Sequence, residues 1–289
     1  MKITLKAYAK INLMLDILSR LENGYHDLFM IMQSVSLYDE VSTEKTSGDS
    51  IEISCNISGI PTDEKNIAYK AAKAFFDYTN IDNEGIHIHI EKNIPHAAGL
   101  AGGSADGAAV IAALDKLYGT NLKEKDIIKI GAKVGADVPF CALGGTMLAQ
   151  YTGTVLSHLP ELDLPYIIIV KPLQDVSTAA AYSAFDTAER VRHLDKKGMF
   201  EAVINGDTES IFSKVDNVFE QFIDVSDRVI IKDIMRKYGA KCACMSGSGP
   251  SVFGIFEDKD SAEKCLSELR KDYEYSYLCH SVDNGLEEI

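Results

Sequence analysis

The first seventeen residues constrain the fold most, because apolar and more polar side chains alternate along them without interruption. The apolar row occupies the odd positions Ile3, Leu5, Ala7, Ala9, Ile11, Leu13, Leu15 and Ile17. Successive side chains of a strand point to opposite faces, so this period of two predicts a long strand or hairpin arm with one buried face. Lys10 and Asn12 belong to the other row. We therefore expect these two side chains to project together, away from the aliphatic row.

The rest of the chain mixes strands and helices. The first half predicts strands at 27–38, 51–55, 86–90 and 144–151 and helices at 66–78, 104–118 and 123–134. After an exposed linker at 160–165 the pattern predicts strands at 166–171, 241–245, 251–256 and 274–281, helices at 178–188, 228–238 and 260–272, and a polar helical stretch at 196–222. Without strict βαβ alternation, an α+β fold is favoured over a doubly wound parallel sheet. We expect two domains, 1–158 and 159–289.

The composition excludes several classes of protein. In 289 residues, 46% are hydrophobic, which excludes a disordered chain, and the net charge of −14 argues against binding nucleic acid. No apolar run is long enough to span a bilayer, and the N-terminus lacks the apolar core of a secretory signal, so we expect no membrane partner. The six cysteines are scattered and lack the paired spacing of a zinc site. These features predict a cytoplasmic protein with reduced core thiols.

A Gly/Ala-rich stretch at 95–109 has the features of a phosphate-binding loop. Gly99, Gly102 and Gly103 permit backbone conformations and a close ligand approach that a Cβ would prevent. Ser104 then opens a helix, whose N-terminus offers free N–H groups and roughly half a positive charge to an anion. A plain connection between a loop and a helix is the alternative. The spacing does not match a P-loop, which requires a lysine after its last glycine.

Asp137 is the only charged residue in a ten-residue stretch that begins at Val134. A carboxylate buried among such neighbours is costly unless it is paired. One interpretation is a general base held beside a cation, for which Lys10 is the candidate. The alternative is that Asp137 caps a helix that begins with Pro139.

A second glycine loop lies between two of the strands expected in the C-terminal half. It contains Ser246, Gly247, Ser248 and Gly249. This loop could line the phosphate pocket from the second domain. A tight hairpin explains the same pattern equally well.

These three segments, in this order, resemble the GHMP kinase family of small-molecule kinases. The segments that carry the resemblance are Ala9–Asn12, Gly24–His26, Gln33–Asp39, Gly135–Phe140 and Met245–Pro250. The resemblance implies an N-terminal ATP-binding domain like ribosomal protein S5 and a C-terminal ferredoxin-like domain. It also implies ATP and Mg²⁺ as cofactors and a monomer or weak homodimer.

The resemblance further implies transfer of a phosphoryl group from ATP to the tertiary 2-hydroxyl of a cytidine diphosphate derivative. Lys10 and Asp137 match the two catalytic positions of the family, and Lys10 acts either on Asp137 and the hydroxyl or on the γ-phosphoryl group. Asn66 resembles a position near the adenine. The implied phosphate loop comprises Pro95, His96, Ala97, Ala98, Gly99, Leu100, Ala101, Gly102, Gly103, Ser104 and Ala105.

The implied substrate contacts lie outside this loop. Tyr25 and His26 match positions that recognise cytosine, Tyr182 matches a second aromatic ring that sandwiches the base, and Asn12 matches a further substrate contact. Two alternatives stay open at this point. One is another kinase of the family, acting on homoserine, mevalonate or a sugar, and the other is a catalytically silent nucleotide-binding protein.

Overall fold

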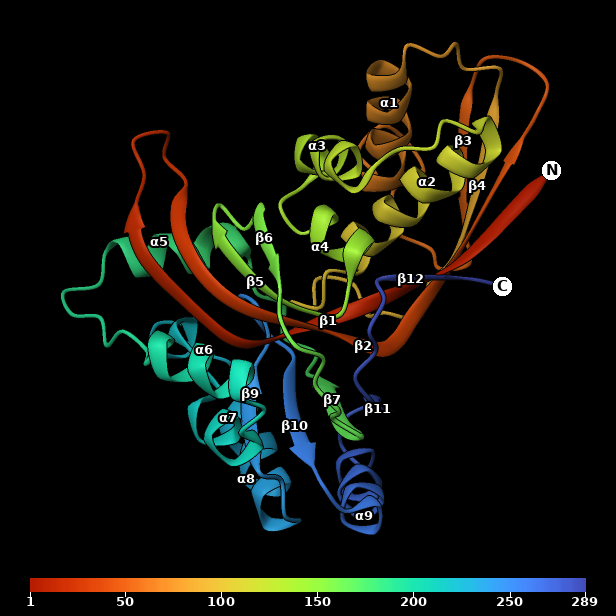
Figure 1. Ribbon diagram of the computed structural model, residues 1–289. Helices are drawn as coiled ribbons and strands as arrows, with labels where there is room; N and C mark the ends of the chain where they lie inside the picture. The colour runs from red at the N-terminus through yellow and green to blue at the C-terminus, as the bar shows by residue number, and fades with distance from the viewer.

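The computed structural model describes residues 1–289 and is built around two sheets (Figure 1). The first sheet contains β1 (Lys2–Arg20), β2 (His26–Lys45), β3 (Ile51–Cys55), β4 (Ile86–Glu91), β5 (Thr146–Tyr151), β6 (Val155–His158), β8 (Asp216–Asn217) and β12 (Leu286–Glu288). Its main order is β12-β1-β2-β4-β3, with β5 on β2, β6 on β5 and β8 on β1. Four helices gather on one side of this sheet (Figure 1): α1 (Ile67–Thr79), α2 (Gly102–Tyr118), α3 (Glu124–Val134) and α4 (Val138–Leu143).

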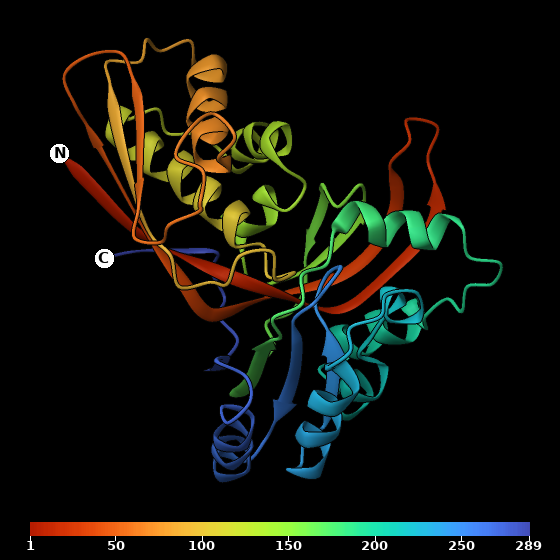
Figure 2. The same cartoon turned by 180° about the vertical axis from the view of Figure 1, so that it is seen from behind.

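The second sheet is antiparallel and contains β7 (Tyr166–Lys171), β9 (Cys242–Met245), β10 (Val252–Phe256) and β11 (Tyr275–Cys279). The remaining helices are α5 (Thr178–Asp186), α6 (Lys196–Asn205), α7 (Thr208–Lys214), the 3₁₀ turn η1 (Val218–Gln221), α8 (Arg228–Lys237) and α9 (Lys259–Leu269). The order β11-β7-β10-β9 places the fourth strand beside the first, with helices in both crossovers. This is the ferredoxin-like arrangement, which confirms the prediction. Figure 2 shows α8 and α9 on the side of this sheet that faces away from helices α1 to α4.

The middle of β1 corrects one expectation, because both of its faces are buried. Lys2 to Lys6 alternate between buried and more exposed, but every residue from Ala7 to Ile17 is buried. Leu5, Ala7, Leu15 and Ile17 pack in the core of the first sheet, whereas Ala9, Ile11 and Leu13, which lie between the register shifts at Tyr8/Ala9 and Asn12/Met14, pack in the core shared with the second sheet. The alternation predicted the strand correctly. It could not show that a second domain covers the other face.

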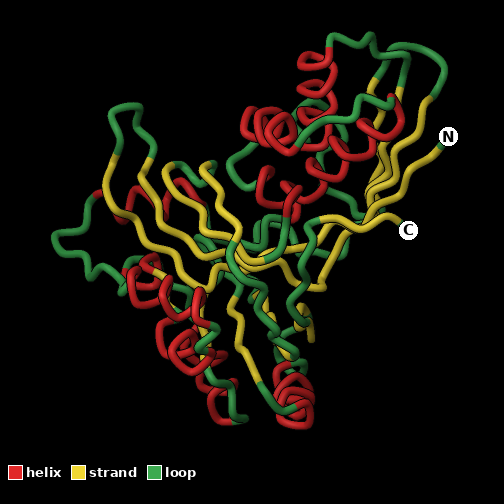
Figure 3. The backbone as a smooth tube through the Cα atoms, viewed as in Figure 1, coloured by secondary structure: helices red, strands yellow, loops and turns green.

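Other boundaries shift for local reasons. The helix expected from Ser104 begins two residues earlier, at Gly102. The polar stretch at 196–222 is not one helix, because Gly206 ends α6 with a φ of 64° and Asp207 caps α7 with its side chain. The short elements α4, β6, β8 and β12 carry too few residues to show a period. Figure 3 shows how much of the second half is loop and short helix.

The division at residue 158 remains a prediction. It falls between β6 and β7, where the first sheet gives way to the second. However, β8 and β12, both from the C-terminal half, pair with β1 of the first sheet. The two halves of the chain are therefore joined by backbone pairing as well as by side-chain packing.

No helix has both the length and the apolar character that crossing a membrane requires. All six cysteines are free, and five of them are buried. Burial raises the pKa of Cys242 to about 12. A thiol with such a pKa stays protonated and behaves as a small core residue.

Candidate active site

A cavity of about 810 Å³ is lined by residues of both halves of the chain. It brings together most of the residues singled out in the sequence, namely Lys10, Tyr25, His26, Asn66, every residue from Pro95 to Ser104, Asp137, Tyr182, Gly247, Ser248 and Gly249. Asn12, Ala105 and Ser246 do not line it and are fully buried. Residues far apart in the chain thus meet in one place.

The loop before α2 presents free backbone donors to this cavity. Ala97, Gly99 and Ala101 have φ values of 51°, 74° and 59°. For the two alanines this left-handed conformation costs about 1–2 kcal/mol each, and such strain is concentrated at functional sites. Ala101 is the N-cap of α2 and supplies no side-chain cap. The N–H groups of the first turn, 102–104, are therefore available to an anion.

The two glycine loops touch each other at the edge of the cavity. The Ser246 hydroxyl donates a hydrogen bond to the Gly99 carbonyl oxygen at 2.9 Å. A Cβ on Gly99 would clash with the Ser246 carbonyl, and one on Gly247 would lie 3.0 Å from the Gly99 carbonyl oxygen. Both positions need glycine, because the backbones approach too closely for a side chain. Ser246 acts in this loop contact rather than in the cavity.

Lys10 and Asn12 do project together from β1, as predicted. Lys10 Nζ donates to Asn12 Oδ1 at 2.7 Å and lies 3.8 Å from Asp137 Oδ2. Asn12 Oδ1 also accepts the Gly247 N–H at 3.0 Å. One buried amide thus fixes the ammonium group relative to the second glycine loop. The structure does not bring Asn12 to the cavity wall, so its geometry supports positioning rather than the expected substrate contact.

Asp137 lies both at the start of a helix and beside Lys10, so its position bears on both interpretations drawn from its sequence. It is the N-cap residue of α4, which begins with Val138 and Pro139. Its carboxylate nevertheless makes no capping hydrogen bond. The side chain is 33% exposed, whereas that of Lys10 is 5% exposed. The carboxylate is therefore free to face Lys10 and the cavity.

We expect Asn12→Leu to lower kcat more than it raises KM for either substrate. The leucine removes the acceptor shared by Lys10 and Gly247, and a buried donor without an acceptor costs about 1–3 kcal/mol. Steady-state kinetics with each substrate varied in turn would measure this split. A change confined to KM for one substrate would support the substrate contact instead.

The far end of the cavity carries aromatic side chains. His26, the first residue of β2, stacks on Tyr182 of α5 with ring centroids 4.6 Å apart and an interplanar angle of 21°. Tyr25 lies at the tip of the β1–β2 hairpin and is 66% exposed. The three residues expected to recognise a base are therefore neighbours of the cavity, and the Tyr25 ring has no aromatic partner.

Asn66 uses its side chain locally. Its Oδ1 accepts the Ala68 N–H at 2.8 Å as the N-cap of α1, and its Nδ2 donates to the Pro61 carbonyl at 2.6 Å. Asn66 therefore caps the helix that the sequence predicts at 66–78. Asn66 also lines the cavity, where it contributes shape more than spare hydrogen-bonding groups.

A buried ionic cluster behind the phosphate loop was missed by sequence reasoning. Lys92 Nζ hydrogen-bonds to Asp39 and, at 2.8 Å, to Asp106 of α2, and all three side chains are buried. A Cβ on Gly102 would lie 2.9 Å from this Nζ. Burial raises the pKa of Asp106 to about 8, against the attraction of Lys92 and with a smaller contribution from the Asp39 charge. The sequence carries no clear signal for it, because Lys92 stands between Glu91 and Asn93 and resembles an ordinary surface lysine.

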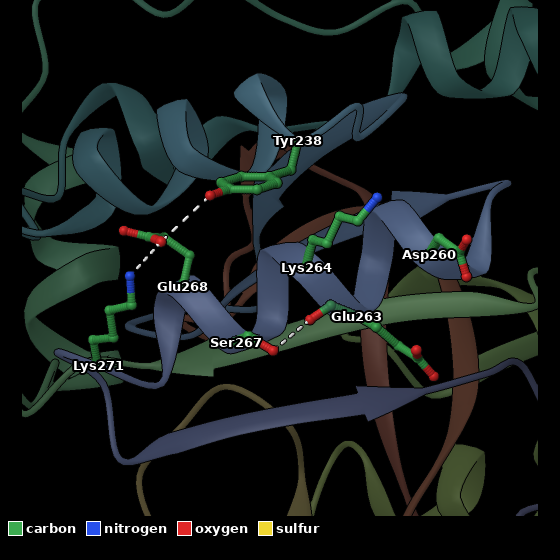
Figure 4. Close-up of a pocket in the computed structure, with 7 residues that line it drawn as sticks. All are labelled: Tyr238, Asp260, Glu263, Lys264, Ser267, Glu268 and Lys271. Atoms are coloured by element: carbon green, nitrogen blue, oxygen red, sulfur yellow. Dashed lines mark hydrogen bonds and ion pairs between the residues drawn. The ribbon is translucent and has the colours of Figure 1, made fainter.

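A second hollow lies between α8 and α9, away from these residues (Figure 4). Its side chains pair with one another: Glu268 accepts from Lys271 at 2.7 Å and from the Tyr238 hydroxyl at 3.3 Å. Six of its seven lining residues are polar or charged, and it is open to solvent. The larger cavity, where the strained loop and the Lys10–Asp137 pair meet, is the candidate active site.

Comparison with known proteins identifies the class to which this fold and site belong. The model of the GHMP kinases N terminal domain matches residues 66–145, and that of the GHMP kinases C terminal domain matches residues 229–274. A homoserine kinase from Cytophaga hutchinsonii, 21% identical, superimposes with a TM-score of 0.79 over 100% of this chain and 97% of its own. At that identity the likeness shows the fold alone.

More similar relatives share a single name. The 4-diphosphocytidyl-2-C-methyl-D-erythritol kinase of Clostridium acetobutylicum is 42% identical over 96% of this chain and 99% of its own length. That of Caldicellulosiruptor saccharolyticus is 44% identical over 92% of both. A crystal structure of 4-(cytidine 5'-diphospho)-2C-methyl-D-erythritol kinase, 29% identical, gives a TM-score of 0.75 over 97% of this chain and 99% of that one. The chain belongs to the GHMP kinases and, within them, to the 4-diphosphocytidyl-2-C-methyl-D-erythritol kinase family. It is a small-molecule kinase, and ATP is the phosphate donor of GHMP kinases.

Proposed function

We propose that this chain transfers the γ-phosphoryl group of ATP to the tertiary 2-hydroxyl of 4-diphosphocytidyl-2-C-methyl-D-erythritol. The observation that carries the proposal is the meeting of Lys10, Asp137 and both glycine loops at one cavity. The names of the relatives indicate the acceptor. The reaction belongs to the non-mevalonate route to isoprenoid precursors and takes place in the cytoplasm. The enzyme acts as a monomer or weak homodimer and needs neither nucleic acid nor a membrane as a partner.

The chain's residues divide the chemistry between them. The free N–H groups at the start of α2 hold the phosphates of ATP. Residues 1–158 form the ATP-binding domain, and residues 159–289 form the second domain. Asp137 accepts the proton of the 2-hydroxyl while the hydroxyl oxygen attacks the γ-phosphorus and ADP leaves. Lys10, held by Asn12, keeps a positive charge beside Asp137 and orients the hydroxyl. In-line positioning then supplies much of the rate enhancement.

The residues at the phosphate loop fit Mg²⁺. The Ser104 hydroxyl lines the cavity and has no hydrogen-bond partner, and a Cβ on Gly135 would lie 4.0 Å from it. Mg²⁺ bound with a nucleotide takes few protein ligands, because phosphate oxygens and water supply the others. We propose Ser104 as its protein ligand. Held there, the ion would neutralise phosphate charge and so lower the electrostatic cost of transfer.

The proposal is tested by ADP release with a panel of acceptors. We expect release that depends on the cytidine diphosphate substrate and little or none with homoserine, mevalonate or a sugar. Faster release with any of those three would assign the enzyme to another acceptor. ATP binding without turnover on any alcohol would favour a silent nucleotide-binding protein.

We expect Tyr25→Ala to weaken binding of the cytidine substrate by about 1–3 kcal/mol, the usual contribution of a base stacked on an aromatic ring. Tyr25 lies in the turn between β1 and β2 and is not part of the phosphate loop, so we expect ATP binding to stay unchanged. Calorimetric titration of each ligand measures both effects. Tyr275→Ala, an exposed tyrosine on β11, is the matched control. Equal weakening of both ligands would remove Tyr25 from base recognition.

A further inference from the structure

Asp186 links α5 to the start of β2 through the ring of His26. His26 Nε2 lies 2.7 Å from Asp186 Oδ1, and the other carboxylate oxygen, Oδ2, lies 3.3 Å from an Arg20 guanidinium nitrogen. The His26 side chain is 8% exposed and that of Asp186 is 23% exposed. No sequence motif pointed to Asp186. The contact joins the hairpin that carries Tyr25 to the helix that carries Tyr182.

This contact decides which nitrogen of His26 carries the proton. An ionised carboxylate can only accept hydrogen bonds, so Nε2 must be the donor. In a neutral imidazole the other nitrogen, Nδ1, then has a lone pair and acts as an acceptor. No protein group hydrogen-bonds to Nδ1, and His26 lines the cavity. The site therefore offers a ligand one acceptor at this point.

The stacking of His26 on Tyr182 sets the plane in which that acceptor lies. The imidazole is within 21° of parallel to the Tyr182 ring, and Phe185 packs on it edge-on at 88°. A planar base that stacks on Tyr182 beside His26 lies almost in the plane of the imidazole. The edge of the base then meets Nδ1 in plane, which is the geometry that a hydrogen bond to a ring nitrogen prefers. Tyr25 can cover the opposite face of the base.

We propose that Asp186 is a positioning residue which makes the site select cytosine over uracil by fixing the tautomer of His26. Cytosine presents an amino group as donor at the position where uracil presents a carbonyl oxygen. The amino group can donate to Nδ1, whereas the carbonyl oxygen would face its lone pair. The selection rests on the proposed function, because it concerns the base of that substrate.

The kinetic test compares Asp186→Asn with the wild type on the cytidine substrate and on its uridine counterpart. An asparagine can donate its amide N–H to Nε2, which permits the opposite tautomer with Nδ1 as donor. We expect KM for the cytidine substrate to rise roughly tenfold, KM for the uridine counterpart to fall or stay constant, and KM for ATP to stay constant. Glu189→Gln removes one charge from an exposed carboxylate without partners and is the control. An unchanged cytidine-to-uridine preference would overturn the proposal.

A second measurement reads the tautomer in the wild-type protein and does not depend on activity. Two-bond ¹H–¹⁵N correlation spectra of the wild-type protein with ¹⁵N-labelled histidine report which nitrogen of each ring is protonated. The His26 signals are identified by their loss in His26→Gln. We expect the tautomer with the proton on Nε2, and a His26 protonated on Nδ1 would contradict the proposal. If the wild type fails to phosphorylate the cytidine substrate while His26 shows this tautomer, the proposed function fails and the role of Asp186 in orienting His26 stands.

Discussion

Asp137→Asn is expected to lower kcat by about 10²–10⁴-fold, the usual contribution of a general base, while KM for both substrates changes little. The asparagine keeps the shape of the side chain but cannot accept the proton of the hydroxyl. Because Asp137 makes no capping hydrogen bond to α4, the change costs the helix no hydrogen bond. The loss of rate therefore reports on chemistry.

Two measurements separate this prediction from a folding defect. The thermal unfolding midpoint of Asp137→Asn is expected to equal that of the wild type, and ATP affinity by calorimetric titration is expected to be kept. Asp163→Asn, which changes the same charge on an exposed residue without partners, is the control and should retain full activity. An Asp137→Asn enzyme with a kcat within a few-fold of wild type would remove Asp137 from its assigned role.

Lys92→Met is expected to lower the free energy of unfolding by about 3–5 kcal/mol, because it removes the buried cation that pairs with Asp39 and hydrogen-bonds to Asp106. Asp39 keeps its hydrogen bonds from the Asn93 and Ile94 N–H groups, at 2.6 and 2.7 Å. Asp106 loses its only partner, since its other oxygen already has none. Equilibrium urea unfolding measures the change.

The mechanism of this loss can be checked by neutralising the carboxylates as well. The triple variant Lys92→Met, Asp39→Asn, Asp106→Asn contains no unpaired buried charge and is expected to regain much of the stability. Lys116→Met breaks an exposed pair with Glu288 and is expected to cost less than about 1 kcal/mol. If Lys92→Met costs no more than Lys116→Met, the cluster does not stabilise the base of the phosphate loop.

The sequence was most informative where the pattern is long or the residue types are rare. The alternation along β1 placed Lys10 and Asn12 on one face, and the structure shows them hydrogen-bonded at 2.7 Å. The glycines at 99 and 247 marked the two loops, and their close contact explains why no side chain fits there. Both signals are local, so one chain segment is enough to reveal each of them.

The contacts that local pattern could not reveal join distant segments. Asp186 meets His26 across 160 residues, and Lys92 meets Asp39 across 53. Each of these carboxylates resembles an ordinary surface residue until the fold supplies its partner. The second buried face of β1 was hidden for the same reason, since it depends on packing against the second sheet, whose first strand, β7, begins at Tyr166.

The most direct test of the account is the ³¹P spectrum of the product formed from ATP and the cytidine diphosphate substrate. The 2-position of the methylerythritol is a tertiary carbon without hydrogen. A phosphate placed there has no proton three bonds away, so we expect a new phosphomonoester signal that is not split by coupling to hydrogen. A doublet or triplet would show transfer to a secondary or primary hydroxyl, and no new signal would show no transfer. Either result would contradict the assignment of this cavity as the site of 2-hydroxyl phosphorylation.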